Sequence, residues 1–138
     1  MKALQITTLT LFAGLAWAAA PVATSQPAVR ETRVVSNDST YAVTYSVLTE
    51  EVEMAELFSI RLRVERLDGE PGRPELAVDA RMPEHGHGMN REPRVERLED
   101  GSFEATNLLF HMPGYWEVYL DLTEGALTER AQFSIELD

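Results

Sequence analysis

The 138-residue sequence predicts an all-β protein, a seven-stranded antiparallel immunoglobulin-like sandwich. After residue 40, apolar residues alternate with polar residues in short segments, and turn residues separate these segments at regular intervals. No long segment has the spacing of an amphipathic helix. Short strands joined by regularly spaced turns are typical of a fold in which two antiparallel sheets share one core.

The first 18 residues have the pattern of a secretory signal peptide. Lys2 precedes an apolar stretch at residues 6–20, and Ala16 and Ala18 supply the small residues of a cleavage site. The stretch is shorter than the about 20 residues that a membrane-spanning helix needs. We therefore expect cleavage after Ala18 and a periplasmic or secreted protein with no membrane span; an uncleaved N-terminal anchor is the alternative.

The next residues predict a tether followed by one domain. Residues 19–39 are rich in Ala, Pro, Ser and Thr and have no sustained apolar period, so we expect a flexible tether ahead of a domain at residues 40–138. Alternating apolar residues predict the first two strands at Tyr41 to Val47 and Phe58 to Val64. The segment from Thr49 to Leu57 is ambiguous, because its apolar and acidic residues also suit a short helix.

Five further strands complete the predicted domain. The alternation continues at residues 76–80, 95–98, 103–109, 115–122 and 127–137. Turn residues separate these segments, and the pair Asp100 and Gly101 favours a tight hairpin.

Composition narrows the chemistry that the chain can perform. The absence of cysteine excludes disulfides, thiolate zinc sites and blue-copper centres. The formal net charge of −11 falls to −12 when the signal, with the single lysine Lys2, is removed, so we expect no nucleic-acid partner. No nucleophile paired with a histidine and an orienting acid stands out, and we do not expect an enzyme.

The histidines are confined to two short segments that also contain methionine. The segment Met82 to Met89, MPEHGHGM, holds two of the three histidines, and the pair His111 and Met112 follows a later predicted strand. In an extended backbone, side chains two residues apart point the same way and stand about 7 Å apart. Imidazole suits Cu, Zn and Ni, and thioether sulfur selects Cu(I). The sequence thus predicts a metal site with the candidate ligands His85, His87, Met89, Met82, His111 and Met112.

Strand order predicts that both segments lie at one end of the sandwich. If each strand crosses the fold once, successive connections alternate between its two ends. The connections at residues 82–89, 111–112 and 49–56 then share an end, and the last brings Met54 and several glutamates. The alternative interpretation makes Met82 and Met112 core residues at strand ends. Met54 is more simply a core or surface residue, and Trp116 a core anchor.

The order of these features resembles the YtkA-like and FixH-like families of small exported or membrane-tethered β-sandwich domains. The matching residues are Met82, Pro83, His85, Gly86, His87, Gly88 and Met89 in the loop, Gly101 in the turn, and Met112, Gly114 and Trp116 at the start of a strand. The resemblance implies a link to copper handling or oxidase assembly. It attaches a ligand role to His85, His87 and Met89, and less directly to Met82, His111 and Met112.

We therefore expect an exported, non-enzymatic copper carrier or buffer. Methionine sulfur would hold Cu(I), whereas His85, His87, His111 and a carboxylate would accept Cu(II), with zinc as an alternative. The second hypothesis is a metal-free interaction module, in which the same loop contacts a periplasmic or membrane protein partner such as an oxidase assembly apparatus.

Overall fold

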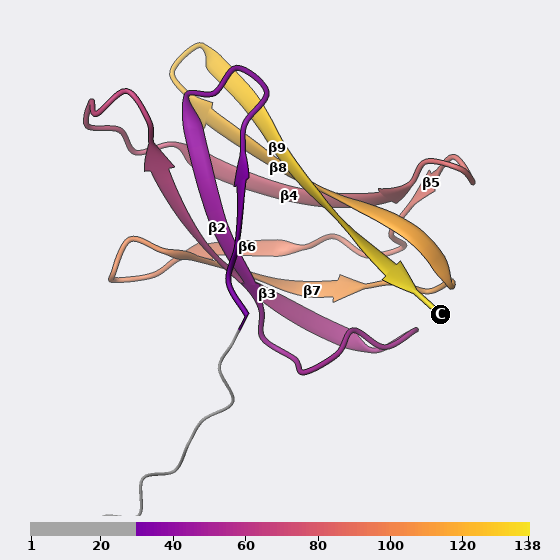
Figure 1. The fold of residues 1–138 in the computed structure, drawn as a ribbon. Helices are drawn as coiled ribbons and strands as arrows, with labels where there is room; N and C mark the ends of the chain where they lie inside the picture. Colours follow the sequence, from indigo (N-terminus) through magenta and orange to yellow (C-terminus); the bar gives the residue numbers. More distant parts are fainter. Residues whose placement is uncertain (1–29) are drawn as a thin grey trace, which may run out of the picture.

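The computed structural model describes residues 30–138; the predicted signal peptide and residues 19–29 of the predicted tether lie outside this range. The described residues are all-β and contain no helix. Their nine strands form two antiparallel sheets, with the orders β1-β2-β3-β7-β6 and β5-β4-β8-β9 (Figure 1). The strands are β1 (Thr32–Val35), β2 (Tyr41–Val47), β3 (Leu57–Arg66), β4 (Glu75–Met82), β5 (His87–Gly88), β6 (Arg94–Arg97), β7 (Phe103–Leu109), β8 (Gly114–Glu124) and β9 (Leu127–Leu137).

The predicted all-β class is confirmed, but the predicted number of seven strands is wrong for residues 30–138. All seven predicted strands are present, and β1 and β5 are additional. β1 lies inside the predicted tether and pairs with β2, so ordered structure begins before the predicted boundary at residue 40. The ambiguous segment before β3 forms bends and a turn in place of a helix.

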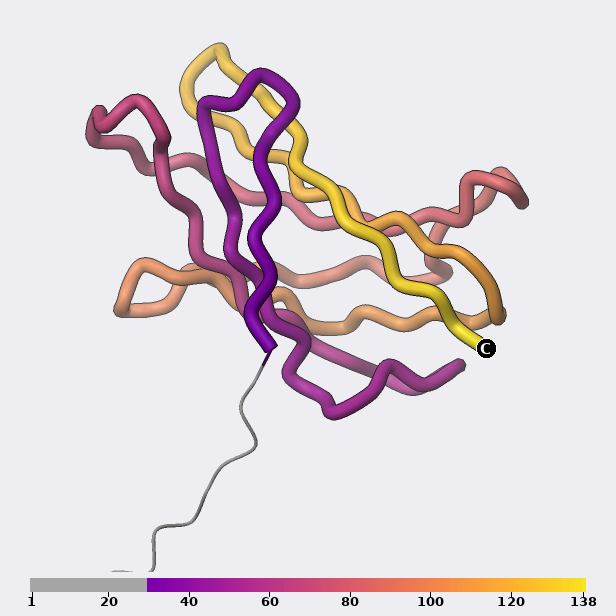
Figure 2. Tube along the Cα trace, viewed as in Figure 1, coloured from indigo at the N-terminus to yellow at the C-terminus, as the bar shows by residue number. Residues whose placement is uncertain are grey.

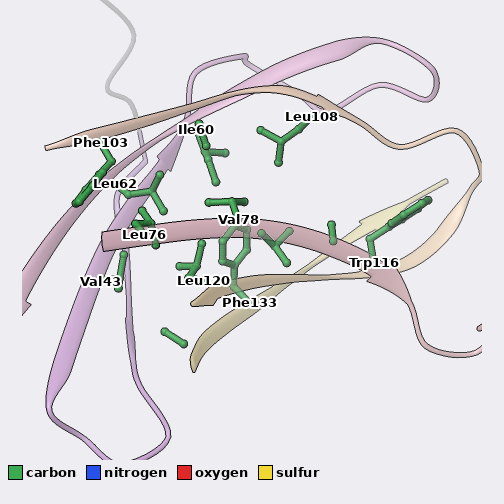
Figure 3. Close-up of a cluster of buried hydrophobic side chains, with 14 of the residues drawn as sticks. Val43, Ile60, Leu62, Leu76, Val78, Phe103, Leu108, Trp116, Leu120 and Phe133 are labelled. Atoms are coloured by element: carbon green, nitrogen blue, oxygen red, sulfur yellow. The ribbon is translucent and has the colours of Figure 1, made fainter. Parts of the chain in front are cut away.

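One hydrophobic core lies between the two sheets. Alternate residues of β3, including Ile60 and Leu62, point into it from one sheet, and alternate residues of β8, including Trp116 and Leu120, point into it from the other (Figure 3). Burying each large apolar side chain stabilises the fold by about 1.5–3 kcal/mol. Trp116 lies toward one end of this core, where its ring stacks on Phe110 with 4.5 Å between centroids.

The connections alternate between two ends of the molecule, as predicted. Residues 48–56, 83–86 and 110–113 gather at the end that also holds the chain terminus, on the right of Figure 2, and we call it the histidine end. There the backbone N–H of Ala55 donates to the carbonyl of Phe110 at 2.7 Å. Hydrogen bonding therefore joins two of the three connections that were predicted to share this end.

The opposite end is held by a network around Glu124. Its carboxylate accepts hydrogen bonds from the Tyr41 hydroxyl at 2.8 Å, from the Arg66 guanidinium at 2.7 Å and from the Arg73 backbone N–H at 2.6 Å. These bonds lower the pKa of Glu124, and the bond from the Arg73 backbone N–H contributes most. Burial, together with the bond to Glu124, raises the pKa of Tyr41 to about 12.

A second carboxylate, that of Glu129, is buried near the same end. The Ser36 hydroxyl donates to it at 2.5 Å, and the Thr40 backbone N–H donates at 3.2 Å. Burial alone would raise the pKa of Glu129, but these hydrogen bonds outweigh burial and lower it. Glu129 thus joins β9 to the turn between β1 and β2.

Candidate functional site

The first two candidate ligands lie in a tight turn between β4 and β5. The backbone N–H groups of His85 and Gly86 both donate to the carbonyl of Met82, at 3.2 and 3.0 Å. Gly86 has a φ of 70°, in the left-handed region that glycine adopts without strain. The backbone at this pair is therefore not extended. The turn instead brings the rings of His85 and His87 to 5.9 Å between centroids.

Strand pairing turns His87 toward the core. His87 lies directly opposite Met82 in the antiparallel ladder, and such partners place their side chains on the same face of a sheet. Because Met82 points into the core, His87 points toward its edge and is half-buried. Its ring centroid lies 5.5 Å from that of His111 and 6.5 Å from that of Trp116. His85 remains exposed.

His111 approaches from the connection between β7 and β8. It follows the buried Phe110, and its ring meets Trp116 edge-on at 5.5 Å. The Trp116 indole N–H donates to the Met112 carbonyl at 3.0 Å and so holds this connection in place. The Nδ1 atom of His111 is buried and has no hydrogen-bond partner in the described part of the chain. A buried polar atom without a partner costs about 1–3 kcal/mol.

The ring separations suit a shared ion for each neighbouring pair. A metal about 2.0 Å from each nitrogen, with the nitrogen roughly 1 Å from its ring centroid, needs centroids within roughly 6 Å of each other. The pairs His85–His87 and His87–His111 both meet this limit. Within residues 30–138, however, no group of three or more His, Asp or Glu side chains is placed to hold one ion. The histidine nitrogens can therefore bind an ion two at a time, and His87 belongs to both possible pairs.

The methionines of this region differ in how exposed they are. Met82 is 1% exposed and belongs to the core, as the alternative interpretation predicted. A Cβ on Gly114 would lie 3.1 Å from its terminal methyl, so glycine there leaves room for Met82. Met89 and Met112 are partly buried against the core edge, and Met54 is 51% exposed. Met89 and Met112 are thus the partly accessible methionines in the two segments that carry the histidines.

Sequence reasoning missed the role of Phe110 and understated that of Trp116. Trp116 forms an aromatic wall beside His87 and His111, and Phe110 supports that wall by stacking on the indole ring. The signal was available, because Phe110 directly precedes His111 and Trp116 follows the same connection. Apolar walls exclude water and raise the cost of an unpaired nitrogen beside them.

Comparisons of the chain with protein-family models, with curated proteins and with solved structures found no match. In residues 30–138, no helix long and apolar enough to cross a membrane is present.

Proposed function

We propose that the protein is an exported, non-enzymatic copper carrier or buffer that holds its ion between His87 and His111. The observation that supports this most is the pair of adjacent imidazoles, one of which keeps a buried nitrogen without a partner. Native structures rarely leave such atoms unsatisfied unless a function requires it. A bound cation would give that nitrogen the partner that it lacks.

The ligand set supports Cu(I) over Zn(II). Protein zinc sites use at least three protein ligands, normally nitrogen, oxygen or thiolate, and only pairs of suitable side chains meet here. Two imidazoles supplemented by the thioether of Met112 or Met89 match the softness of Cu(I). Exposed His85, 5.9 Å from His87, would pass the ion between this pair and the surroundings.

We also propose that the fold is a variant of the immunoglobulin-like sandwich and that the chain is related to the YtkA-like and FixH-like families. Two facing antiparallel sheets support the first part. The second part is supported by the motifs that carry the resemblance, because the loop at residues 82–89 and the segment from Met112 to Trp116 meet at the histidine end.

A metal-free interaction module for a membrane-associated complex is the second candidate. It is favoured by the lack of any group of three His, Asp or Glu ligands in residues 30–138. In that case the loop at residues 83–86, which is exposed throughout, would be a contact surface.

Titration with Cu(I) under anaerobic conditions tests the proposal. The predicted mature chain contains Trp116 as its one tryptophan, and this ring adjoins both histidines, so its fluorescence should be quenched with saturation at one equivalent. His87→Ala removes the shared nitrogen and should weaken binding at least about tenfold, a loss of about 1.4 kcal/mol. Met54→Leu changes an exposed thioether at the same end and should leave the affinity unchanged.

Two results would contradict the proposal. Wild-type protein that takes up no stoichiometric copper would support the metal-free module. Copper bound equally well by wild type and by His87→Ala would place the ion elsewhere on this acidic chain.

A further inference from the structure

The two edge strands β1 and β9 enclose a groove along one side of the molecule. Near the opposite end the turn after β1 is linked to β9, because the Asn37 N–H donates to the Arg130 carbonyl and the Arg130 N–H donates to the Asn37 side-chain oxygen. Toward the histidine end the two strands diverge (Figure 1). The space between them is a groove of about 1110 Å³, bordered by Thr32 on β1 and by Ile135 to Leu137 on β9.

The free edge of β9 carries backbone hydrogen-bonding groups that are unpaired within the described residues, and it leads into this groove, which Glu136 lines. Arg130 directs its N–H and its carbonyl away from β8, toward Asn37. Backbone groups alternate in direction along an antiparallel strand, so those of Gln132, Ser134 and Glu136 point to the same free edge. In residues 30–138 these three positions have no backbone partner on that side, since β9 pairs with β8 alone. A free edge of this kind accepts an added strand.

The groove combines an apolar floor with an acidic rim. Partly buried Tyr45, Val47, Val52 and Ile135 form the floor. The residues that line the groove include one cationic side chain, that of Arg30. They also include five acidic residues, which form the rim: Glu50, Glu51, Glu53, Glu136 and Asp138. Such a surface complements a segment in which apolar side chains alternate with basic ones.

We infer that this groove binds an extended basic segment of another protein, which adds to the free edge of β9 as a strand. Other occupants fit less well. Residues 19–29 of the chain itself contain two prolines and neither Lys nor Arg. A second copy of the chain would bring the same acidic rim against this one, and like charges in contact disfavour association. The inference uses none of the candidate metal ligands and is independent of copper binding.

The probe is an N-acetylated, C-amidated six-residue peptide of alternating Arg and Val, with a control peptide in which Glu replaces Arg. The Arg peptide should bind the predicted mature protein with 1:1 stoichiometry in calorimetry, and the Glu peptide should not bind. In ¹⁵N-resolved NMR spectra, the largest shifts should fall on the backbone N–H groups of Gln132, Ser134 and Glu136. Added salt should weaken the complex, because the rim charges are exposed.

Two variants distinguish the contribution of the acidic rim to peptide binding from that of the β9 backbone. Reversing the rim with Glu50→Lys, Glu51→Lys and Glu53→Lys should lower the affinity at least about tenfold. Ser134→Pro removes one outward N–H while sparing the pairing with β8, and it should abolish binding. Thr128→Pro makes the same change on the same edge but away from the groove, and it should bind like wild type. Thermal unfolding of each variant checks that the fold is kept.

Several results would overturn the inference. One is a peptide affinity in the rim variant and in Ser134→Pro that equals the affinity of wild type. Another is a set of peptide-induced NMR shifts confined to a different surface. A third is peptide binding that is abolished by His87→Ala. Concentration-dependent dimerisation that Ser134→Pro prevents would assign the edge to a second copy. Peptide affinity that rises when residues 19–29 are deleted would assign the groove to the chain's own segment.

Discussion

Glu124, at the end opposite the histidines, accepts hydrogen bonds from three groups, whereas at the histidine end the buried Nδ1 of His111 has no partner in the described residues. Both ends close the same core. At the opposite end, polar side chains are used to fasten strands together. At the histidine end, Trp116 and Phe110 supply the packing, and the Nδ1 of His111 beside them is bonded to no group of the described residues.

We infer from this difference that the polar groups at one end stabilise the fold, whereas those at the other end are available to bind a ligand. A buried polar group without a hydrogen-bond partner is costly, and such groups are often found where they take part in binding or catalysis. We therefore expect changes at Glu124 and Glu129 to alter folding, and changes at His87 and His111 to alter binding. The four predictions below test this division.

The largest effect is expected for Trp116→Ala. The side chain is fully buried and is stacked on Phe110, so its removal should lower the free energy of unfolding by about 3–5 kcal/mol. Urea unfolding followed by far-UV circular dichroism measures this loss. The neighbouring change Tyr115→Ala removes an exposed ring and should cost far less. Similar losses in both variants would mean that Trp116 does not anchor the histidine end.

Glu129→Gln should have the next largest effect and should depend on pH. Replacing the buried carboxylate should cost about 1–3 kcal/mol near neutral pH, because charge-assisted hydrogen bonds from Ser36 and Thr40 are weakened. Since folding lowers the pKa of Glu129, its carboxylate stabilises the fold above the unfolded-state pKa. That contribution is lost as the pH falls through the folded-state pKa.

The difference in unfolding free energy between wild type and Glu129→Gln should therefore shrink in acid. Unfolding curves at a series of pH values from neutral to acidic measure it. A difference that stayed constant over this range would show that the charge of Glu129 is not what stabilises the fold.

Tyr41→Phe should have a smaller effect at the same end. It removes the hydroxyl that donates to Glu124 and keeps the buried ring, so we expect a loss of about 0.5–1.5 kcal/mol. Because Glu124 keeps its bonds from Arg66 and Arg73, the network should persist in part. Thermal unfolding of the variant beside wild type measures the loss, and an unchanged midpoint would contradict it.

His111→Leu should have the smallest effect on stability. It removes the cost of an unpaired buried nitrogen but also the ring contact with Trp116, and because these effects oppose each other the free energy of unfolding should change by less than about 1 kcal/mol, with either sign. Cu(I) affinity should fall at the same time. Destabilisation as large as that of Trp116→Ala would show that His111 is a structural residue, and the contrast between the two ends would fail.

The longer strands were predictable because two-residue alternation is a local signal. The pattern Phe58, Ile60, Leu62 fixes which face of β3 is buried, whatever the rest of the chain does. β1 and β5 carry too little of this signal. β5 has two residues and exists because the preceding turn returns His87 to Met82, and β1 has four residues and is ordered by pairing with β2.

The candidate site was predictable in its position but not in its details. The alternation of connections between the two ends depends only on strand order. It was therefore enough to predict that His111 lies at the same end as the loop that carries His85 and His87. The ring separations depend on the φ of Gly86 and on the direction of His87, which strand spacing does not determine. The burial of Met82 and the support that Phe110 gives to the Trp116 wall are properties of packing between sheets, which no local pattern records.

The position of the last residues affects how the protein can be handled. Leu137 is buried and pairs with Gly114, and Asp138 borders the groove beside β9. A fusion joined after Asp138 would start inside the surface that is to be assayed, and a polyhistidine sequence there would compete for copper. A removable label ahead of residue 19, where the predicted mature chain begins, would keep the C-terminal edge clear, provided that it is cleaved before any titration.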